Sequence, residues 1–221
     1  MRFCLFFILF LLPNFTYAQN AEQWEKYNSS LLVEITRQSG IFTCSGVAVS
    51  KSIVLTAAHC LDGEIKNIKV FVQERYIPKN NYYKVKSFHL NPYYSSKKSL
   101  FESDVAKIIL KSPLPSSINI CPIYLGSLLS GRISRMGYGK RNGDNIRTMV
   151  TPVFKRFDYS KNVLELYDEY SQSGDSGGPI FISLGEQIYL VGIHSTLSYG
   201  PQGTYSLNPV LEKNLTWIFK N

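Results

Sequence analysis

The sequence has few of the side chains that bind metals, and it has no long hydrophobic run. Its 221 residues include four cysteines and three histidines, and these residues do not stand at the spacing of a zinc site. The apolar run at residues 3–12 is too short to span a bilayer as a helix. The chain also contains no repeat of fixed period and no low-complexity tract. We therefore expect no metal, no other cofactor, no transmembrane helix and no repeat architecture.

Positive charge is in excess, but it is not concentrated. The formal net charge is +8, and the densest basic points are the pairs Lys97-Lys98 and Lys140-Arg141. Proteins that bind nucleic acids usually carry a concentrated basic stripe, so we expect no nucleic-acid partner. The excess charge either attracts acidic substrates over a distance or only keeps the protein soluble.

The N-terminus has the layout of a secretory signal peptide. Arg2 supplies a basic start, residues 3–12 are wholly apolar, and small residues lead to Ala18, after which cleavage is expected. A buried N-terminal strand is the alternative interpretation of the same run. We expect residues 1–18 to be removed and the mature protein to be secreted, either outside the cell or into a periplasm, without stable insertion in a membrane.

Short runs rich in Val, Ile, Tyr and Phe recur along the rest of the chain, bounded by Gly, Asn, Ser or Pro, which is typical of β-strands. They lie at residues 31–36, 43–50, 52–57, 68–73, 85–90, 105–110, 132–136, 148–157, 163–167, 179–183, 187–194 and 203–207. Regular spacing without helical patterns between the runs favours an all-β barrel or sandwich. Residues 210–220 have the apolar spacing of an amphipathic helix.

Three residues far apart in the chain are suited to act together as a nucleophile, a base and an orienting carboxylate. The stretch "LTAAHC" contains His59, "ESDVAKIIL" contains Asp104, and the glycine-rich "SQSGDSGGPIFI" presents Ser176. A serine hydroxyl needs a neighbouring base such as histidine to become a good nucleophile, and a carboxylate orients that base. The glycines let the backbone bend so that the N–H groups of Gly174 and Ser176 can bind an oxyanion.

These motifs resemble those of the chymotrypsin/trypsin family of serine endopeptidases. "TAAHC", the Asp-Val-Ala strand start and "GDSGGP" occur in the order of the family. The stretches "MGYGK" (136–140), "YLVGIHS" (189–195) and "LTWIFK" (215–220) extend the resemblance over roughly residues 31–221. The resemblance implies an all-β fold of two antiparallel six-stranded barrels of the chymotrypsin type with a C-terminal helix. We expect the first barrel within residues 19–122 and the second barrel, with the helix, within residues 123–221.

The same resemblance implies the activity and the cross-link. The expected protein is a monomeric serine endopeptidase that acts on polypeptides, with Ser176 as nucleophile, His59 as general base and Asp104 as orienting carboxylate. Cys44 and Cys60 match the disulfide of the family that closes the loop carrying the histidine. Cys121 has no evident partner once the signal peptide, with Cys4, is removed.

The chain departs from the family at the segment that normally activates it. Family members usually mature by cleavage before an Ile-Val-Gly-Gly start, and the new amine pairs with the aspartate beside the nucleophile, here Asp175. No such start is present. One hypothesis is that removal of the signal peptide frees the amine of Gln19 to pair with Asp175. The other is that internal donors satisfy Asp175.

The residues that match the specificity pocket of the family suggest a preference before the cleaved bond. Tyr170 occupies the pocket-floor position where trypsins carry an aspartate, which removes the basis for cleavage after Arg or Lys and could shorten the pocket. His194 matches a histidine that contacts the substrate carboxylate in glutamyl endopeptidases, and Ser171 and Ser173 match their hydroxyls. A histidine with two hydroxyls can hydrogen-bond a carboxylate or an amide and reject apolar side chains, which favours Glu, then Gln.

Two further residues complete the expected substrate site. Ser195 would offer backbone hydrogen bonds to an extended substrate and contact the side chain of Asp104, and Leu197 stands near the pocket mouth. An alternative role for His194 is that of a buried strand residue that donates to a backbone carbonyl. An alternative for the whole protein is a non-catalytic homologue that serves as a secreted binding or regulatory module. A metal-dependent hydrolase is the third class, and the spacing of potential ligands does not support it.

Overall fold

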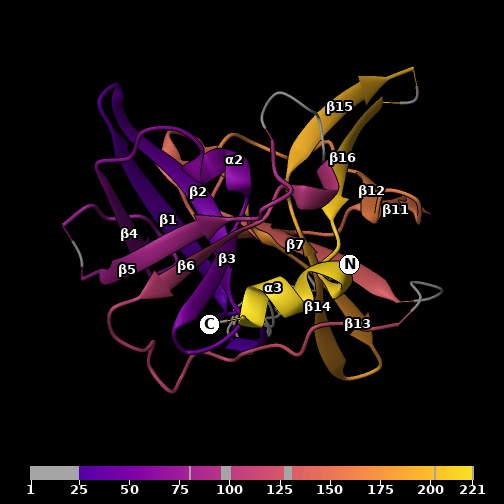
Figure 1. The fold of residues 1–221 in the computed structure, drawn as a ribbon. Coiled ribbons are helices and arrows are strands. Elements are labelled where there is room, and N and C mark those ends of the chain that lie inside the picture. The colour runs from indigo at the N-terminus through magenta and orange to yellow at the C-terminus, as the bar shows by residue number, and fades with distance from the viewer. Residues whose placement is uncertain (1–24, 80, 96–100, 127–130, 202, 221) are drawn as a thin grey trace, which may run out of the picture.

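The computed structural model describes residues 25–79, 81–95, 101–126, 131–201 and 203–220 (Figure 1). The expected signal peptide and Gln19 lie outside the described residues. Two strand-rich halves lie side by side in Figure 1, with the first half in indigo and magenta and the second in orange and yellow. The prediction of a chymotrypsin-type all-β fold with a short C-terminal helix is confirmed.

The first half is a closed antiparallel barrel. Its strands follow the order β1-β2-β3-β6-β5-β4. They are β1 (Ser30–Arg37), β2 (Gly40–Ala48), β3 (Ile53–Thr56), β4 (Asn67–Phe71), β5 (Tyr83–Leu90) and β6 (Ala106–Leu110). Alternate residues of β1, namely Leu31, Val33 and Ile35, point into one apolar core, as the two-residue period of a strand requires. All six strands coincide with runs expected from the sequence.

The second half contains two four-stranded sheets and a short hairpin rather than one closed ladder. The first sheet has the order β10-β7-β13-β14 and the second has the order β11-β12-β16-β15. The strands are β7 (Arg132–Gly137), β8 (Lys140–Arg141), β9 (Asp144–Asn145), β10 (Thr148–Val150), β11 (Val153–Asp158), β12 (Val163–Tyr167), β13 (Pro179–Leu184), β14 (Gln187–Ile193), β15 (Thr196–Gly200) and β16 (Gly203–Pro209). A bridge between Gly192 and Val210 joins the two sheets at one corner.

The strands of this half differ from those expected from the sequence in two respects. The single run expected at residues 148–157 is two strands that belong to different sheets, because Pro152 between them has no N–H to continue the ladder. The hairpin of β8 and β9 was not expected, since its strands are two residues long and polar. The strand β15 was not expected either, although its sequence TLSYG alternates polar and apolar residues.

An apolar cluster joins the two halves. It contains Val47 and Leu55 from the first barrel, Met136 and Phe181 from the second half, and Ile218 from the C-terminal segment. Burial of such side chains is worth roughly 2 kcal/mol each. The candidate active-site residues lie on a short helix and on loops next to these packed strands.

The C-terminal helix is shorter than the sequence suggests. A 3-10 turn, η2 (Glu212–Asn214), precedes the helix α3 (Leu215–Phe219). Lys107 on β6 donates through Nζ to the carbonyl oxygens of Trp217 (3.1 Å) and Lys220 (2.7 Å) at the end of this helix. A lysine at this place satisfies carbonyls that the helix itself leaves without donors, and it ties the end of the chain to the first barrel.

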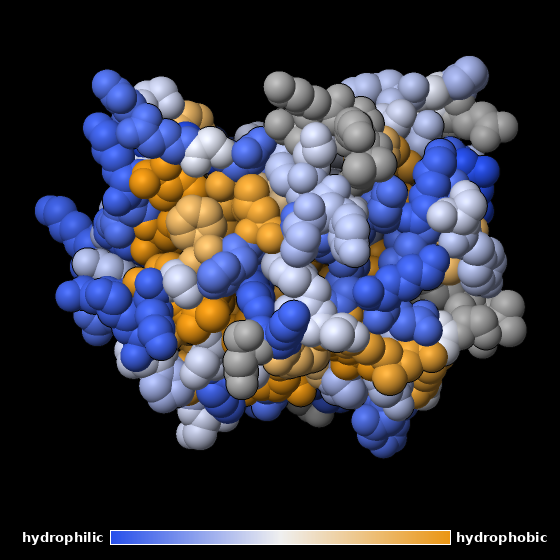
Figure 2. Space-filling model, viewed as in Figure 1, coloured by the Kyte–Doolittle hydropathy of each residue, from blue (hydrophilic) through white to orange (hydrophobic). Residues whose placement is uncertain are grey.

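The surface in Figure 2 is mixed. Orange apolar residues gather over the first barrel at the left of the view, and blue hydrophilic residues surround them and cover much of the rest. Within the described residues, no helix is long and apolar enough to cross a membrane.

Candidate active site

His59 is held at the seam between the halves by a short helix. Strand β3 ends at Thr56, and the helix α2 (Ala58–Leu61) follows at once. Cys60 on this helix forms a disulfide with Cys44 on β2, as expected from the resemblance. The disulfide anchors the helix to the barrel, while the side chain of His59 stays 40% exposed and can meet a substrate.

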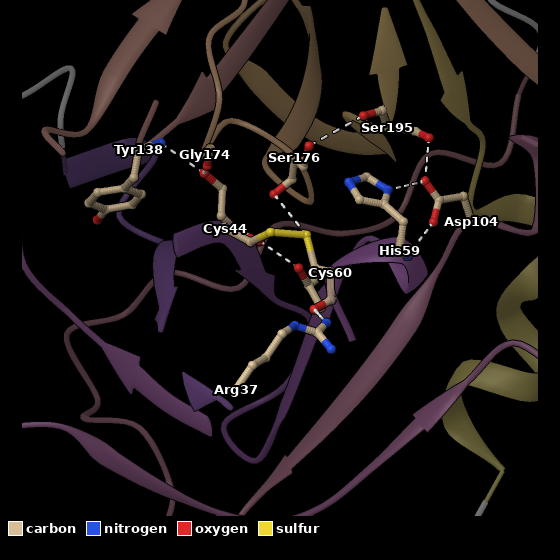
Figure 3. Close-up of a disulfide and its surroundings, with 11 residues drawn as sticks. Arg37, Cys44, His59, Cys60, Asp104, Tyr138, Gly174, Ser176 and Ser195 are labelled. Atoms are coloured by element: carbon tan, nitrogen blue, oxygen red, sulfur yellow. Dashed lines mark hydrogen bonds and ion pairs between the residues drawn. A yellow bond between two sulfur atoms is a disulfide. The ribbon is translucent and has the colours of Figure 1, made fainter. Parts of the chain in front are cut away.

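Asp104 lies beside the His59 ring and binds both the ring and the backbone of His59. It follows a 3-10 turn, η1 (Phe101–Ser103), just before β6. Its Oδ1 accepts the backbone N–H of His59 at 2.8 Å, and its Oδ2 lies 2.7 Å from His59 Nδ1. The hydroxyl of Ser195 donates to the same Oδ2, as expected. Figure 3 shows the ring of His59 between Asp104 and Ser176.

The charge of Asp104 is maintained although the residue is buried. Burial acts to raise its pKa, but the hydrogen bond and charge of His59, the Ser195 hydroxyl and the His59 N–H together hold the pKa below its ordinary value. An ionised Asp104 requires a hydrogen on His59 Nδ1. In the neutral ring, Nε2 is then free to accept a proton.

Ser176 sits in a loop that only glycines can form. Gly174 and Gly177 have φ angles of +102° and +82°, a region that favours glycine. A Cβ at Gly177 would also collide with the side chain of Thr56 and the backbone of Ser45. The carbonyl oxygen of Ser176 accepts the N–H of Ser45 at 2.7 Å, so the loop is fastened directly to the first barrel.

The Ser176 hydroxyl is turned toward a carbonyl in this structure. Its Oγ donates to Ser195 O at 3.4 Å, and no hydrogen bond to His59 is present among the described residues. Catalytic hydrogen bonds often form only when substrate is bound. Among the described residues, neither the Gly174 N–H nor the Ser176 N–H donates to another group, so both can donate to a ligand oxygen.

Asp175, beside the nucleophile, is fully buried and has internal donors on both oxygens. Oδ1 accepts the N–H of Gly139 at 2.7 Å, and Oδ2 accepts the N–H of Gln172 at 2.9 Å and Nη2 of Arg141 at 2.8 Å. Arg135 Nη1 lies 3.1 Å from Oδ2. Burial acts to raise the pKa of Asp175, but the two guanidinium groups hold it below its ordinary value. Donors from the described residues therefore satisfy Asp175, which is the arrangement of the second hypothesis.

Arg135 extends this cluster into the second half. Its Nε and Nη2 donate to both oxygens of Asp168, at 2.5 and 3.1 Å, and all three side chains of Arg135, Asp168 and Asp175 are without exposed surface. Sequence reasoning missed Arg135 and Asp168, and it noted Arg141 only for its charge. The available signal was the position of Arg135 inside the expected strand at residues 132–136.

A cleft of about 620 Å³ contains the three catalytic candidates and most of the expected substrate-binding residues. Of the latter, it is lined by Ser171, Ser173, His194, Ser195 and Leu197. Residues not expected there also line it: Tyr94, Ser95, Phe101, Gln172, Thr196 and Tyr199.

Tyr170 is the one expected pocket residue outside this cleft. Its side chain is 67% exposed, so the structure does not bring it to the pocket floor. Its backbone explains the position, because the N–H donates to Asp168 Oδ1 and the carbonyl accepts from Arg141 Nη2. These bonds fix the main chain and leave the ring in solvent.

His194 lies deep in the cleft wall and is almost fully buried. Its Nε2 is 2.7 Å from Ser171 Oγ, and its Nδ1 is 3.1 Å from Asn208 Oδ1. Burial, followed by the nearby charge of Arg135, lowers the pKa of His194 to about 4. The ring is therefore neutral at physiological pH.

The potential metal-ligating side chains of the described residues do not form a cluster. Within the described ranges, no group of three His, Cys, Asp or Glu side chains could hold a metal ion. Cys121 is buried and forms no disulfide with another described residue, and burial raises the pKa of its thiol.

Comparison with solved structures gives the same fold. The protease Anisep from Arthrobacter nicotinovorans matches 84% of this chain and 91% of its own, with a TM-score of 0.65 and 16% identity. The thermostable serine protease AL20 from an extremophilic microorganism matches 88% of this chain and 96% of its own, with a TM-score of 0.67 and 18% identity.

Sequence comparison shows the family. Vitamin K-dependent protein C of Mus musculus is 27% identical over 210 residues, and serine protease filzig of Drosophila melanogaster is 25% identical over 213; each match covers 79% of this chain. The match spans only 45% and 12% of the lengths of these two relatives. The sequence model of the Trypsin family matches residues 19–218. With the His59–Asp104 pair facing Ser176 across a chymotrypsin-type seam, this chain belongs to the Trypsin family of chymotrypsin-like serine proteases.

Proposed function

We propose that the protein is a secreted serine endopeptidase that hydrolyses peptide bonds through an acyl-enzyme. The observation that carries the proposal is the set of hydrogen bonds at Asp104. Its Oδ2 accepts from His59 Nδ1 at 2.7 Å and from the Ser195 hydroxyl. This arrangement keeps the far nitrogen of His59 as a proton acceptor on the side of Ser176. The relatives named above that are called proteases support the same reaction class.

The proposed reaction has two stages, acylation and deacylation, and His59 transfers protons in both. Ser176 Oγ attacks the substrate carbonyl carbon as His59 Nε2 takes its proton, and the Gly174 and Ser176 N–H groups bind the resulting oxyanion. The tetrahedral intermediate collapses when His59 gives the proton to the leaving amine. Water then attacks the acyl-enzyme with His59 as base again, which releases the acid and restores Ser176.

Secretion is supported by two features. The first is the signal-peptide layout of residues 1–18. The second is the Cys44–Cys60 disulfide, since disulfides form and persist mainly in oxidising compartments such as the exterior or a periplasm.

For specificity, we propose cleavage after Glu or Gln. His194, Ser171 and Ser173 line the cleft that also contains Ser176, and their resemblance to the pocket of glutamyl endopeptidases supports this preference. No acidic side chain other than Asp104 lines that cleft in the described part of the chain, so a substrate Arg or Lys has no further carboxylate to meet there.

A fluorophosphonate probe tests the reaction class. We expect the secreted protein to be labelled at Ser176, with labelling abolished in Ser176→Ala and reduced by at least about a hundredfold in Asp104→Asn. Ser198→Ala serves as the control, because the Ser198 hydroxyl donates to Tyr205 on the neighbouring strand and, among the described residues, is not part of the cleft lining. Absence of labelling in a folded, N-terminally sequenced protein would instead favour the non-catalytic binding module.

A peptide panel that varies only the residue before the cleaved bond tests the specificity. Glu or Gln peptides should show the highest kcat/KM, and His194→Ala should remove the preference. Arg or Phe peptides performing best would contradict the proposal for the pocket while leaving the protease assignment intact.

A further inference from the structure

We propose that Asn208 locks His194 as a hydrogen-bond acceptor on its cleft side, so that the pocket selects a substrate carboxamide, the side chain of Gln, over a carboxylate. This inference rests on the proposed function and decides between the two residues named there. Asn208 is a positioning residue, since it lies behind His194 and does not line the cleft.

The orientation of the Asn208 amide is determined by two partners that cannot change roles. Its Nδ2 lies 2.9 Å from the carbonyl oxygen of Leu164, which only accepts. Its Oδ1 lies 3.4 Å from the backbone N–H of Ser195, which only donates. Nδ2 also donates to Ser206 Oγ at 2.8 Å. A flipped amide would lose the first two bonds in a buried site, where an unmade hydrogen bond costs roughly 1–3 kcal/mol.

The fixed amide determines which nitrogen of His194 carries hydrogen. Asn208 Oδ1 can only accept, so His194 Nδ1, 3.1 Å away, must donate. The neutral ring has one hydrogen on its two nitrogens, so Nε2 carries none and is an acceptor. Ser171 Oγ, 2.7 Å from Nε2, must donate its own hydrogen to the ring.

The Ser171 hydroxyl therefore faces the cleft as an acceptor, while Ser173, which also lines the cleft, has a hydroxyl that can still donate. The Ser171 hydroxyl has used its hydrogen on His194, so only its lone pairs remain toward the cleft. The N–H of a glutamine carboxamide matches these lone pairs, whereas a glutamate carboxylate meets them with its own. A polar site left unmatched in this way discriminates strongly between substrates of similar shape.

None of the charged groups near His194 in the described structure can pair with a substrate carboxylate. Arg135, whose charge acts on His194, is bound to Asp168 and Asp175 and has no exposed surface. Arg141 pairs with the same Asp175. The two arginines and two aspartates balance, and none of the four lines the cleft. A buried His194 with lowered pKa does not supply a positive charge either.

Kinetics on three matched peptides tests the inference. The peptides carry Gln, Glu or Met before the cleaved bond and are otherwise identical. At pH 7.5 we expect kcat/KM for Gln to exceed that for Glu by at least about tenfold. The ratio should fall as the pH is lowered toward 5, because protonation of the Glu carboxylate or of His194 creates a donor. Any effect of His59 on kcat/KM is the same for both peptides and cancels in their ratio. A Glu peptide cleaved as well as the Gln peptide at pH 7.5 would overturn the inference but not the protease assignment.

Two variants separate Asn208 from a merely structural role. In Asn208→Asp, the carboxylate beside Nδ1 should raise the pKa of His194, so the Gln/Glu ratio should fall at pH 6 with kcat for the Gln peptide less affected. In Ser171→Ala, the carboxamide should donate to Nε2 directly and the preference for Gln should persist. Loss of all Gln preference in folded Ser171→Ala, with the Ser198→Ala control unchanged, would contradict the assigned roles.

Nuclear magnetic resonance gives a readout that needs no activity. In the full-length Ser176→Ala variant labelled with nitrogen-15, the ring shifts of His194 should report a protonated Nδ1 and an unprotonated Nε2 from pH 6 to 8. A hydrogen on Nε2 would overturn the inference whatever the substrate. A correct tautomer together with no labelling of wild-type Ser176 would instead reject the proposed protease function and leave the geometry standing.

Discussion

Arg141 lies against Asp175 with Nη2 2.8 Å from Oδ2, although the two residues are 34 positions apart. Arg141 comes from the hairpin of β8 and β9, which the sequence did not predict, and Asp175 precedes the nucleophile. With Arg135, it supplies the positive charge that a freed N-terminal amine supplies in relatives activated by cleavage. The oxyanion loop is thus held by side chains of the folded domain.

Removal of Arg141 should therefore impair catalysis more than stability. In Arg141→Ala we expect kcat/KM to fall about ten- to a hundredfold, because Asp175 loses its partly exposed partner and the Gly174 and Ser176 N–H groups lose their alignment. The measurement is kcat/KM with the melting temperature alongside. Arg75→Ala is the matched control, since Arg75 pairs with Asp144 of the same hairpin but both side chains are more than half exposed.

An N-terminal extension provides the complementary test of the same arrangement. Adding a short peptide before Gln19 should leave turnover unchanged, because Asp175 has its donors inside the described domain. Severe loss of activity in the extended protein would show that the amine is needed and would revive the first hypothesis.

Ser195→Ala should weaken the triad through Asp104. The pKa of Asp104 lies below its ordinary value of 3.8, so its ionisation stabilises the fold above that value, and this contribution is lost as pH falls through the folded-state pKa. Without the Ser195 hydroxyl, the pKa of Asp104 should rise. We expect the acid unfolding midpoint to move to higher pH and kcat to fall several-fold. Acid titration of intrinsic fluorescence and steady-state kinetics measure the two effects.

The disulfide should contribute mainly to stability. Cys44 and Cys60 are 16 positions apart in the sequence, and for a loop of that size loop entropy predicts about 3 kcal/mol. The double variant Cys44→Ala/Cys60→Ala should lose about that much free energy of unfolding in urea. Cys121→Ala is the comparison and should lose less, since Cys121 makes no disulfide with another described residue.

Lys107→Met should loosen the C-terminal helix. The substitution keeps most of the side-chain volume but leaves the Trp217 and Lys220 carbonyls without their donor, at a cost of roughly 1–3 kcal/mol. Hydrogen exchange should rise selectively in Leu215–Phe219. The exposed Lys111 offers a control, and an equal effect of Lys111→Met would contradict the assigned role.

The sequence by itself determined the fold class and the three catalytic candidates. Strands such as β1 and β12 are visible in the sequence because most of their residues are apolar. His59, Asp104 and Ser176 are visible because each stands in a short motif. Tertiary structure alone decided what surrounds them. Tyr170 points to solvent because its backbone is bonded to Asp168 and Arg141, and Asp175 is satisfied by arginines from distant strands. The protonation of His194 follows from Asn208, 14 residues away. Hydrogen-bond partners of buried polar groups depend on which strands pair, and that information is not carried by any single stretch of sequence.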